Sequence, residues 1–212
     1  PRQQAIIERV LAAAAGSYLL GAIPTSQLVA KHLAGIDLRA VGSGNLGATN
    51  LYRVLGWKFA VPVATFDLAK GAIPVVAFAP WADASLVGAL FLGAAAVFGH
   101  IFSVFANFSG GKGVATSAGV LLALAPVAFA GALALWAAVL AASGYVSLAS
   151  IIAAIALPPA LWFLEPSRHQ LVWWFTGIAA LVVWMHRANI RRLVNGTEHR
   201  FGRRVAAVRP HD

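Results

Sequence analysis

Three short polar stretches carry most of the side chains that are able to do chemistry in this chain. The first, residues 42–50, reads Gly-Ser-Gly-Asn-Leu-Gly-Ala-Thr-Asn, and Arg53 follows it. Glycines let a backbone approach a ligand closely, hydroxyls and amides form neutral hydrogen bonds, and an arginine binds phosphate through two N–H groups. The stretch also fits the dinucleotide pattern G-x-G-x-x-G, but that pattern follows a strand, and an apolar run precedes it here. It predicts an anion-binding loop, with an ordinary helix-capping loop as the alternative.

The second stretch is Ser109-Gly110-Gly111-Lys112-Gly113. A nucleotide-binding P-loop would need a further glycine six residues before the lysine and Ser or Thr directly after it. Ala106 and Gly113 occupy those two positions, so nucleotide hydrolysis is not expected. A glycine-rich turn that holds a lysine and leads into a helix still predicts an anion site. The alternative is a loop whose lysine serves only to orient the protein in a membrane.

The third stretch, residues 186–198, places His186 and Asn189 three residues apart and therefore on one helix face. With Glu198 further along, it predicts a polar site, although a lone histidine there is more often structural. Asp67 and Lys70 are also three apart, inside an apolar run, where a mutual salt bridge that supports the nearby loops is expected. His32 and Asp37 share the spacing of another acyltransferase class, which two residues match easily by chance.

The composition indicates which kind of secondary structure holds these stretches in place. The 212 residues are 60% hydrophobic and 11% charged, with a mean hydropathy of +0.78, whereas soluble domains are nearer half apolar and a quarter charged. The apolar runs are about as long as a bilayer core requires. A polytopic, all-α membrane protein is therefore predicted. The chain has no cysteine, which excludes disulfides, thiol catalysis and cysteine-ligated metals.

Seven spans are expected, and the first is interrupted at Gly21–Pro24. Residues 113–142 are too long for one span and contain Pro126, so two helices that turn near Ala125 are favoured. Arg2 and Arg9 before an apolar run resemble a cleaved signal, but the rest of the chain is equally hydrophobic, so this run is expected to be the first span. The predicted spans are about 6–33, 58–79, 84–105, 113–125, 127–142, 148–164 and 170–186.

Seven spans gather the basic residues on one side of the membrane. That side would hold Lys31, Arg39, Arg53, Lys58, Lys112 and the seven arginines of the tail 187–212, against Arg2, Arg9 and Arg168 on the other. The excess of Lys and Arg in cytoplasmic loops predicts an outside N terminus and a cytoplasmic C terminus. The tail is read first as this topology signal, with anionic lipid headgroups or a phosphate surface as alternatives. No nucleic-acid-binding motif accompanies it.

Taken together, the three stretches resemble the bacterial membrane glycerol-3-phosphate acyltransferases that use acyl phosphate as donor. The resemblance runs in register over nearly the whole chain and includes Gly21–Thr25, Asp67–Gly71, Gly99-His100 and Ser147–Ile151. The chain departs from the family pattern at four positions, none of them a proposed site residue: Ser26, Leu38, Ser103 and Ser109. The resemblance implies one membrane domain, 1–212, in the bacterial cytoplasmic (inner) membrane, with about seven helices and all three motifs on the cytoplasmic face.

The resemblance also implies the reaction and the residues that carry it. A fatty acyl group would pass from long-chain acyl phosphate to the sn-1 hydroxyl of glycerol 3-phosphate, giving lysophosphatidic acid and phosphate, the first step of phospholipid synthesis. The expected partners are these two substrates and membrane lipids, with no nucleic acid, cofactor or metal, and the protein is expected to be a monomer. The expected catalytic residues are Ser43, Arg53, Lys112, His186 and Asn189. The expected substrate-binding residues are Gly44, Asn45, Gly47, Thr49, Asn50, Gly110, Gly111, Gly113, Ser150, Arg187 and Glu198.

Two questions stay open at this point. The hydroxyl proton is taken either by His186 or by a phosphate oxygen of the substrate, and the second is favoured because acyl phosphate is already an activated donor. A covalent acyl-Ser43 is less favoured, since no base is evidently paired with that serine. The alternative function is a transporter of phosphate or an organic anion, which would place polar residues across the membrane depth, often in two related halves. The sequence has no such repeat and concentrates its chemistry on one face, which favours the enzyme.

Overall fold

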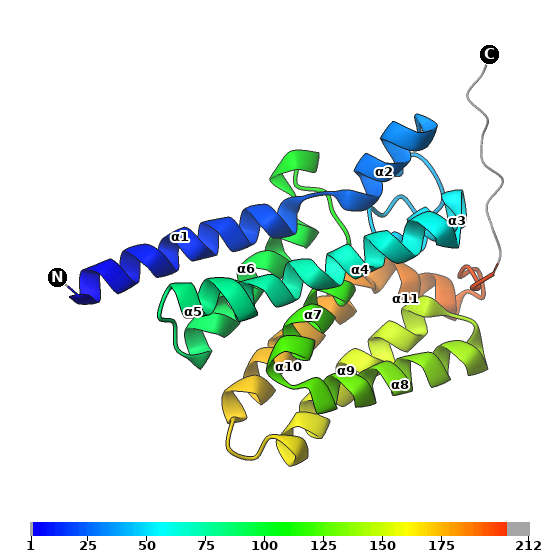
Figure 1. Ribbon diagram of the computed structural model, residues 1–212. Coiled ribbons are helices and arrows are strands. Elements are labelled where there is room, and N and C mark those ends of the chain that lie inside the picture. Colours follow the sequence, from blue (N-terminus) through cyan, green and yellow to red (C-terminus); the bar gives the residue numbers. More distant parts are fainter. Residues whose placement is uncertain (1, 203–212) are drawn as a thin grey trace. The chain divides into compact units, whose positions relative to one another are not determined.

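The computed structural model describes residues 2–202, and every regular element in that range is helical (Figure 1). This confirms the predicted all-α class. Two helix boundaries coincide with prolines: α1 stops before Pro24, and α8 starts at Pro126. Three arginines of the basic tail, Arg203, Arg204 and Arg209, lie outside the described residues.

The chain forms two compact units, the first up to Val120 and the second from Leu121. The first unit contains α1 (Arg2–Ala22), α2 (Thr25–Ala34), α3 (Ala48–Leu55), α4 (Trp57–Ile73), a π-helical turn (Pro74–Phe78), α5 (Ala79–Trp81), α6 (Leu86–Ile101) and a 3₁₀ turn (Val104–Ala106). α7 (Val114–Leu124) crosses the boundary between the units. The second unit contains α8 (Pro126–Ser143), α9 (Val146–Leu164), α10 (His169–Met185) and α11 (Arg187–Val194).

Five helical stretches of the described chain are long and apolar enough to cross a membrane. They are Gln3–Ala34, Trp57–Trp81, Leu86–Ala106, Pro126–Ser143 and Val146–Leu164. A sixth is obtained if α10 and α11, which meet at a bend of 56°, count as one span, and α7 is shorter. A multi-pass membrane protein follows from these lengths, whereas the total of seven spans stays a prediction.

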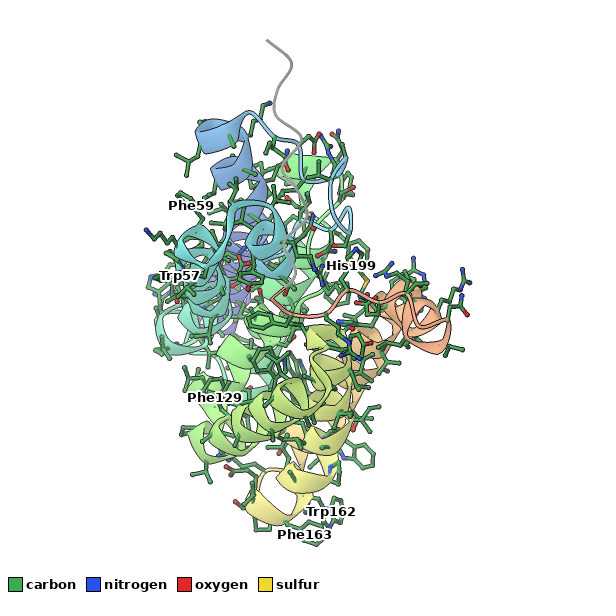
Figure 2. All side chains as sticks on the ribbon, turned by 90° about the vertical axis from the view of Figure 1, so that its right-hand side faces the viewer. Trp57, Phe59, Phe129, Trp162, Phe163 and His199 are labelled. Carbon is green, nitrogen blue, oxygen red and sulfur yellow. The ribbon has the colours of Figure 1, made fainter. Side chains whose placement is uncertain are left out.

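Large apolar side chains remain on the surface of both units, as expected of helices that face lipid. Trp57 and Phe59 lie at the start of α4, and Trp162 and Phe163 lie at the end of α9 (Figure 2). Phe163 is 80% exposed. Aromatic side chains at helix ends are typical of the boundary between membrane and water. These exposed rings therefore need no protein partner.

Helices of the first unit approach one another through glycines. A Cβ added at Gly21 of α1 would overlap the Ala96 carbonyl of α6, and one at Gly99 of α6 would overlap the Tyr18 carbonyl of α1. Small residues let helix backbones pack closely in lipid, where water supplies no hydrophobic driving force between helices. The glycine-rich composition of the spans thus has a direct packing role.

Replacing Gly71 by alanine is expected to destabilise the first unit. A Cβ at this position of α4 would overlap the Thr116 carbonyl oxygen of α7, and backbone cannot move aside cheaply. Overpacking costs typically 1–3 kcal/mol, so the thermal midpoint in detergent should fall by several degrees. Gly131→Ala in α8 is the matched control, because nothing lies within 4 Å of its added Cβ. A Gly71→Ala midpoint equal to that of the control would contradict this close packing.

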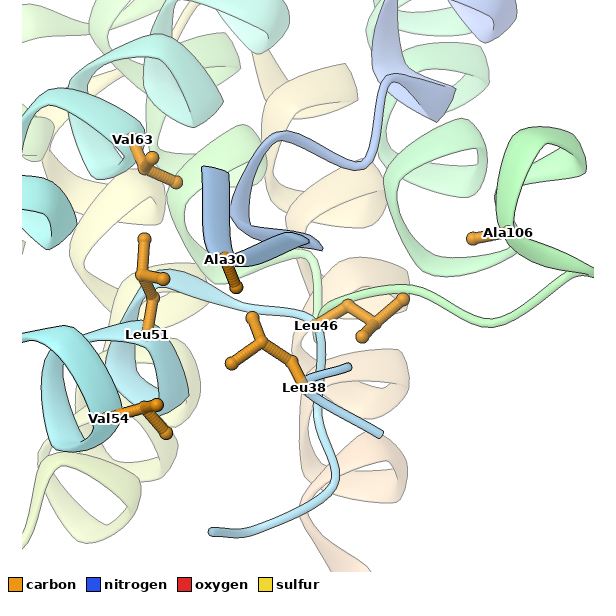
Figure 3. Close-up of a cluster of buried hydrophobic side chains, with 7 residues drawn as sticks. All are labelled: Ala30, Leu38, Leu46, Leu51, Val54, Val63 and Ala106. Atoms are coloured by element: carbon orange, nitrogen blue, oxygen red, sulfur yellow. The ribbon is translucent and has the colours of Figure 1, made fainter. Parts of the chain in front are cut away.

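A buried apolar cluster packs against the first polar stretch. Its members come from α2, α3, α4 and the loops at 35–47 and 102–113, and they are Ala30, Leu38, Leu46, Leu51, Val54, Val63 and Ala106 (Figure 3). Leu38 and Leu46 belong to the loop itself and are almost completely buried. Burial of a leucine side chain contributes roughly 1.5–3 kcal/mol. The polar loop is therefore held in one conformation by its own leucines.

Candidate functional site

The loop from Gly42 to Gly47 is shaped by two glycines and one asparagine. Gly42 and Gly44 have φ values of 61° and 70°, in the left-handed region that other residues avoid. The buried Asn50 amide accepts a hydrogen bond from the Ser43 N–H at 2.9 Å and donates to the carbonyls of Leu38 and Val41. Ser43 is half-buried between the two glycines. The Asn50 side chain thus supports the loop, and its binding of substrate stays a prediction.

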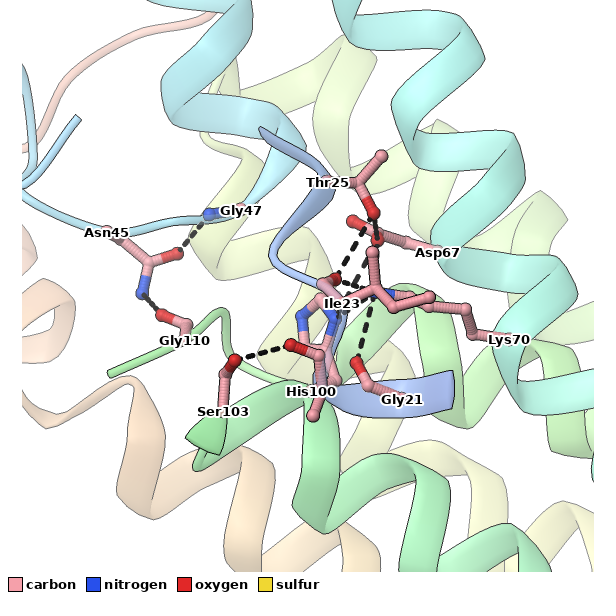
Figure 4. A network of polar contacts seen from close by, with 11 residues as sticks. Gly21, Ile23, Thr25, Asn45, Gly47, Asp67, Lys70, His100, Ser103 and Gly110 are labelled. Atoms are coloured by element: carbon pink, nitrogen blue, oxygen red, sulfur yellow. Dashed lines mark hydrogen bonds and ion pairs between the residues drawn. The ribbon is translucent and has the colours of Figure 1, made fainter. Parts of the chain in front are cut away.

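Asn45 joins the first polar stretch to the second. Its Nδ2 donates to the Gly110 carbonyl at 3.2 Å, and its Oδ1 accepts from the Gly47 N–H at 3.0 Å (Figure 4). The Leu46 N–H donates to the same Gly110 carbonyl at 3.4 Å, and a Cβ on Gly47 would lie 4.0 Å from the Gly111 Cα. Two glycine-rich loops that are 65 residues apart in sequence are therefore in backbone contact.

Each of these loops leads into the N terminus of a helix. Gly47 directly precedes α3, and Gly113, with a φ of 78°, directly precedes α7. Helix N termini present unpaired N–H groups and the positive end of the helix dipole, which favours anions. The contact between the loops thus brings the two glycine-rich stretches together, and anion binding by each of them stays a prediction.

The two predicted cations of this unit lie on the same elements as the loops. Arg53 projects from α3 and is 7% exposed, and Lys112 is half-buried between Gly111 and Gly113. Thr49 lies in the first turn of α3. That Arg53 binds an anionic substrate stays a prediction. Arg53 and Lys112 both also make interactions with the protein.

Sequence reasoning missed one residue that shapes this site, Gln27 of α2. Its Oε1 accepts from the Leu38 N–H at 2.9 Å, and its Nε2 donates to Asp37 at 3.1 Å. The Arg39 side chain and N–H also donate to Asp37 and lower the pKa of that carboxyl to about 2. Asp37 therefore pairs with Arg39 and with Gln27. The sequence feature that could have identified Gln27 is its polar amide within an otherwise apolar run.

The second unit holds the third polar stretch around Glu198. This carboxylate is 7% exposed and accepts from Ser147 Oγ at 3.0 Å, from Asn189 Nδ2 at 2.7 Å and from Arg192 Nε at 2.7 Å. Burial raises the pKa of Glu198, but the hydrogen bonds from Asn189, Arg192 and Ser147 and the charge of Arg192 outweigh it, so the pKa is lowered. Glu198 fixes the orientation of the Asn189 amide.

Replacing Glu198 by glutamine is expected to reduce the acid sensitivity of the second unit. A carboxyl whose pKa is lower in the folded protein contributes stability that is present above its unfolded pKa, near 4.5, and is lost as the pH falls through the folded value. The amide does not titrate. Melting in detergent between pH 7 and pH 3 should therefore show a shallower pH dependence for Glu198→Gln than for wild type. The exposed Glu8→Gln control should retain the wild-type slope, and equal slopes in all three would contradict the network.

His186 lies at the bend between α10 and α11 and is 3% exposed. Its Nδ1 is 2.7 Å from the Val182 carbonyl oxygen, and a carbonyl only accepts, so Nδ1 carries the proton. In the neutral ring Nε2 is then the acceptor, which suits a group that receives a hydrogen bond from a hydroxyl. Arg187, the next residue, is exposed and lies over the Trp184 ring at 4.4 Å.

Ser150 is buried on α9 and its hydroxyl already has two protein partners. It donates to the Val146 carbonyl at 2.9 Å and accepts from Trp136 Nε1 at 3.1 Å. Nothing in the polar stretches of the sequence indicated Trp136, which belongs to the apolar helix α8. Substrate binding by Ser150 stays a prediction, and the same holds for Ser43, Thr49 and Arg187.

The structure thus brings the predicted residues together in two groups, one in each unit. In the first unit, the loop that contains Ser43, Asn45 and Gly47 touches the loop that contains Gly110 and Gly111. In the second unit, Asn189 and Glu198 form one hydrogen-bonded network. The loop contact in the first unit suits an anion, and the network in the second unit fixes the Asn189 amide.

Known proteins are similar to this chain both in sequence and in fold. The family model described as glycerol-3-phosphate acyltransferase matches residues 11–196. Proteins named glycerol-3-phosphate acyltransferase from Trichlorobacter lovleyi and Chlorobaculum tepidum are 50% and 42% identical, over 88% and 89% of this chain and 95% of each relative.

Two solved structures of PlsY (YgiH), described as an integral membrane glycerol 3-phosphate acyltransferase, are also similar. The glycerol 3-phosphate form has a TM-score of 0.84 and 41% identity, and covers 91% of this chain and 96% of its own. The lysophosphatidic acid form has a TM-score of 0.81 and 39% identity, and covers 92% of this chain and 96% of its own. On these matches of motif order, sequence and helix arrangement, the chain belongs to the glycerol-3-phosphate acyltransferase family.

Proposed function

We propose that the chain transfers a fatty acyl group from acyl phosphate to the sn-1 hydroxyl of glycerol 3-phosphate, releasing lysophosphatidic acid and inorganic phosphate. The observation that carries the proposal is the contact between the two glycine-rich loops at Asn45 and Gly110, each ahead of a helix N terminus. Both substrates carry a phosphate, and two adjacent anion-attracting ends suit them. Family membership supplies the reaction class.

The residues take the following roles in this proposal. Arg53 and Lys112 balance the negative charge of the two phosphates, and the Gly110–Gly113 loop holds glycerol 3-phosphate. Ser43 and Asn45 supply hydrogen bonds near the phosphates and near the oxyanion that forms on the acyl carbon. His186 and Asn189 orient the acceptor, and Glu198 fixes Asn189. The acyl chain lies among apolar helices and enters from the bilayer.

The bond changes need no metal or cofactor. The sn-1 oxygen attacks the acyl carbon, the bond from that carbon to the phosphate oxygen breaks, and the hydroxyl proton goes to a phosphate oxygen. Acyl phosphate has a good leaving group, so a strong protein base is not required. His186, whose Nδ1–H is held by Val182, accepts a hydrogen bond at Nε2 and thereby orients the hydroxyl.

The same proposal places the N terminus outside and the active site on the cytoplasmic face of a bacterial inner membrane. The ion pair between Arg9 and Asp83, at 3.5 Å, supports a common side for the start of α1 and the turn before α6. The chain has no cysteine, so Lys58→Cys and Asp83→Cys variants each carry one exposed thiol. An impermeant maleimide applied to intact cells should label the Asp83→Cys variant and not the Lys58→Cys variant. Labelling of the Lys58→Cys variant alone would indicate the opposite orientation.

The experiment that tests the reaction uses purified protein in liposomes with palmitoyl phosphate. Phosphate release and lysophosphatidic acid formation are followed with and without glycerol 3-phosphate. Release that requires the acceptor, with one product lipid per phosphate, establishes acyl transfer. A folded protein that releases no phosphate but carries phosphate or glycerol 3-phosphate into the liposomes would be the transporter instead.

A further inference from the structure

A buried ionic cluster lies between α4 and α6, outside the groups assigned above. Lys70 is 1% exposed and Asp67 is 2% exposed, and Lys70 Nζ lies 2.7 Å from Asp67 Oδ1. Nζ also lies 3.4 Å from His100 Nδ1. Ionisable residues inside a membrane span are costly unless they are paired and are generally kept for a function. The salt bridge explains how the charges are tolerated, but it leaves the further contacts of Lys70 to be explained.

These further contacts fix the break between α1 and α2. Lys70 Nζ donates to the carbonyls of Gly21 at 3.2 Å and Ile23 at 2.9 Å, and Ser103 Oγ donates to the Ala22 carbonyl (Figure 4). A helix that ends within the apolar layer leaves carbonyls without partners, and here side chains from other elements satisfy three in succession. The break is therefore set by α4 and by the segment after α6.

The cluster reaches the Gly110–Gly113 loop through His100. An ammonium group only donates, so His100 Nδ1 accepts from Lys70 and the ring proton lies on Nε2. That side of the ring lies against Gly111, where an added Cβ would overlap Nε2. The His100 carbonyl also accepts from the Gly111 N–H at 3.0 Å. His100 thus holds Gly111 both through its ring and through its backbone.

We propose that Lys70, together with Asp67 and His100, is a positioning group that holds the Gly110–Gly113 loop, and with it Lys112, in the geometry that binds the phosphate of glycerol 3-phosphate. The contacts of the cluster are to protein carbonyls and to Gly111, so the cluster acts on the loop and not directly on the substrate. Gly110 also accepts from Asn45, whereas the first loop has its own support from the Asn50 amide and from the buried Leu38 and Leu46. This inference rests on the proposed function, which assigns glycerol 3-phosphate to that loop.

The test uses a charge-neutral double variant, Asp67→Asn with Lys70→Met, in liposomes. Methionine retains the length of lysine without its donors, and asparagine leaves no buried carboxylate unpaired. A displaced loop is expected to lower kcat/KM for glycerol 3-phosphate about 10²-fold, mainly through KM, with little change in KM for acyl phosphate. Hydrogen exchange at residues 109–113 should become faster, because Lys70 no longer holds His100, whose backbone carbonyl accepts from the Gly111 N–H.

Two further variants complete the design. His100→Asn keeps an oxygen that accepts from Lys70 but removes the part of the ring that lies against Gly111, so it should reproduce both effects if the double variant does not fold. Tyr18→Phe is the control: it removes a 2.8 Å hydrogen bond from α1 to the Phe102 carbonyl without touching the loop, and its kinetics should equal wild type.

The outcomes separate the two proposals. If the wild-type protein shows no acceptor-dependent acyl transfer, the proposed function is wrong. Hydrogen exchange at residues 109–113 would still report whether the cluster holds the loop. An active wild type together with folded variants that keep wild-type KM values and wild-type exchange would overturn the positioning role. Equal increases in the KM of both substrates would also overturn it, because they would indicate a general loss of structure.

Discussion

The Lys112→Ala variant is expected to lose about 10³ in kcat/KM for acyl transfer. Lys112 is half-buried in the glycine loop directly before α7, where its charge adds to the helix dipole. Removal of one preorganised donor in an active site typically costs 10²–10³-fold, and under the proposed function a full positive charge that balances two phosphates is lost as well. Initial rates over a range of both substrate concentrations measure the effect.

Lys58→Ala is the matched control for this prediction. Lys58 is an exposed lysine at the start of α4, and its removal should leave kcat/KM within a small factor of wild type. Added salt provides a second check. Screening weakens the attraction of exposed charges far more than that of buried ones, so salt should reduce any contribution of Lys58 to kcat/KM more than that of Lys112. A Lys112→Ala protein that folds and transfers acyl groups at the wild-type rate would remove this lysine from the site.

The His186→Ala variant is expected to lose about 10²-fold in rate, and the glutamine variant much less. A general base contributes typically 10²–10⁴-fold, and glutamine cannot replace it. If His186 orients the acceptor by accepting at Nε2, as its Nδ1–H bond to Val182 allows, then the amide oxygen of His186→Gln can take over part of that role. Retention of most activity by His186→Gln therefore supports proton transfer to a substrate phosphate.

The pH profile of these variants distinguishes the two roles further. Loss of a protein base removes the limb of the kcat profile that reports its ionisation, whereas loss of an orienting acceptor lowers the profile without changing its shape. Asn189→Ala is a suitable comparison, because Asn189 is held by Glu198 at 2.7 Å and has no group that titrates. His186→Gln activity as low as that of His186→Ala, with an altered profile, would assign the base to His186.

Several elements of the fold followed from sequence because they depend on local chemistry. Pro24 and Pro126 lack an N–H and coincide with the breaks after α1 and before α8, which were predictable for that reason, although α4 continues through Pro62 and α9 through Pro158 and Pro159. The tight turns of the glycine-rich motifs were predictable for the same reason, since Gly42, Gly44 and Gly113 adopt positive φ values. Hydrophobic run length gave the membrane class.

The partners of the polar side chains did not follow, because they come from residues far apart in the chain. Substrate binding by Asn45 and Asn50 stays a prediction, and the structure adds that their amides tie loops together. Gln27 and Trp136 had no motif to mark them, and each contacts a site residue or its loop. The motif predicted a polar site at Asn189, but only folding brings Ser147 and Asn189 to one Glu198 oxygen.

The family, the reaction class and the types of the candidate site residues could be predicted because they depend on motifs within short continuous segments. Which polar groups contact one another, and which ones support the loops, became visible only in the folded chain. The physical basis is that buried polar atoms must find partners. Lys70 illustrates this: in sequence it is one half of a salt bridge with Asp67, and in space it also meets the end of α1 and His100.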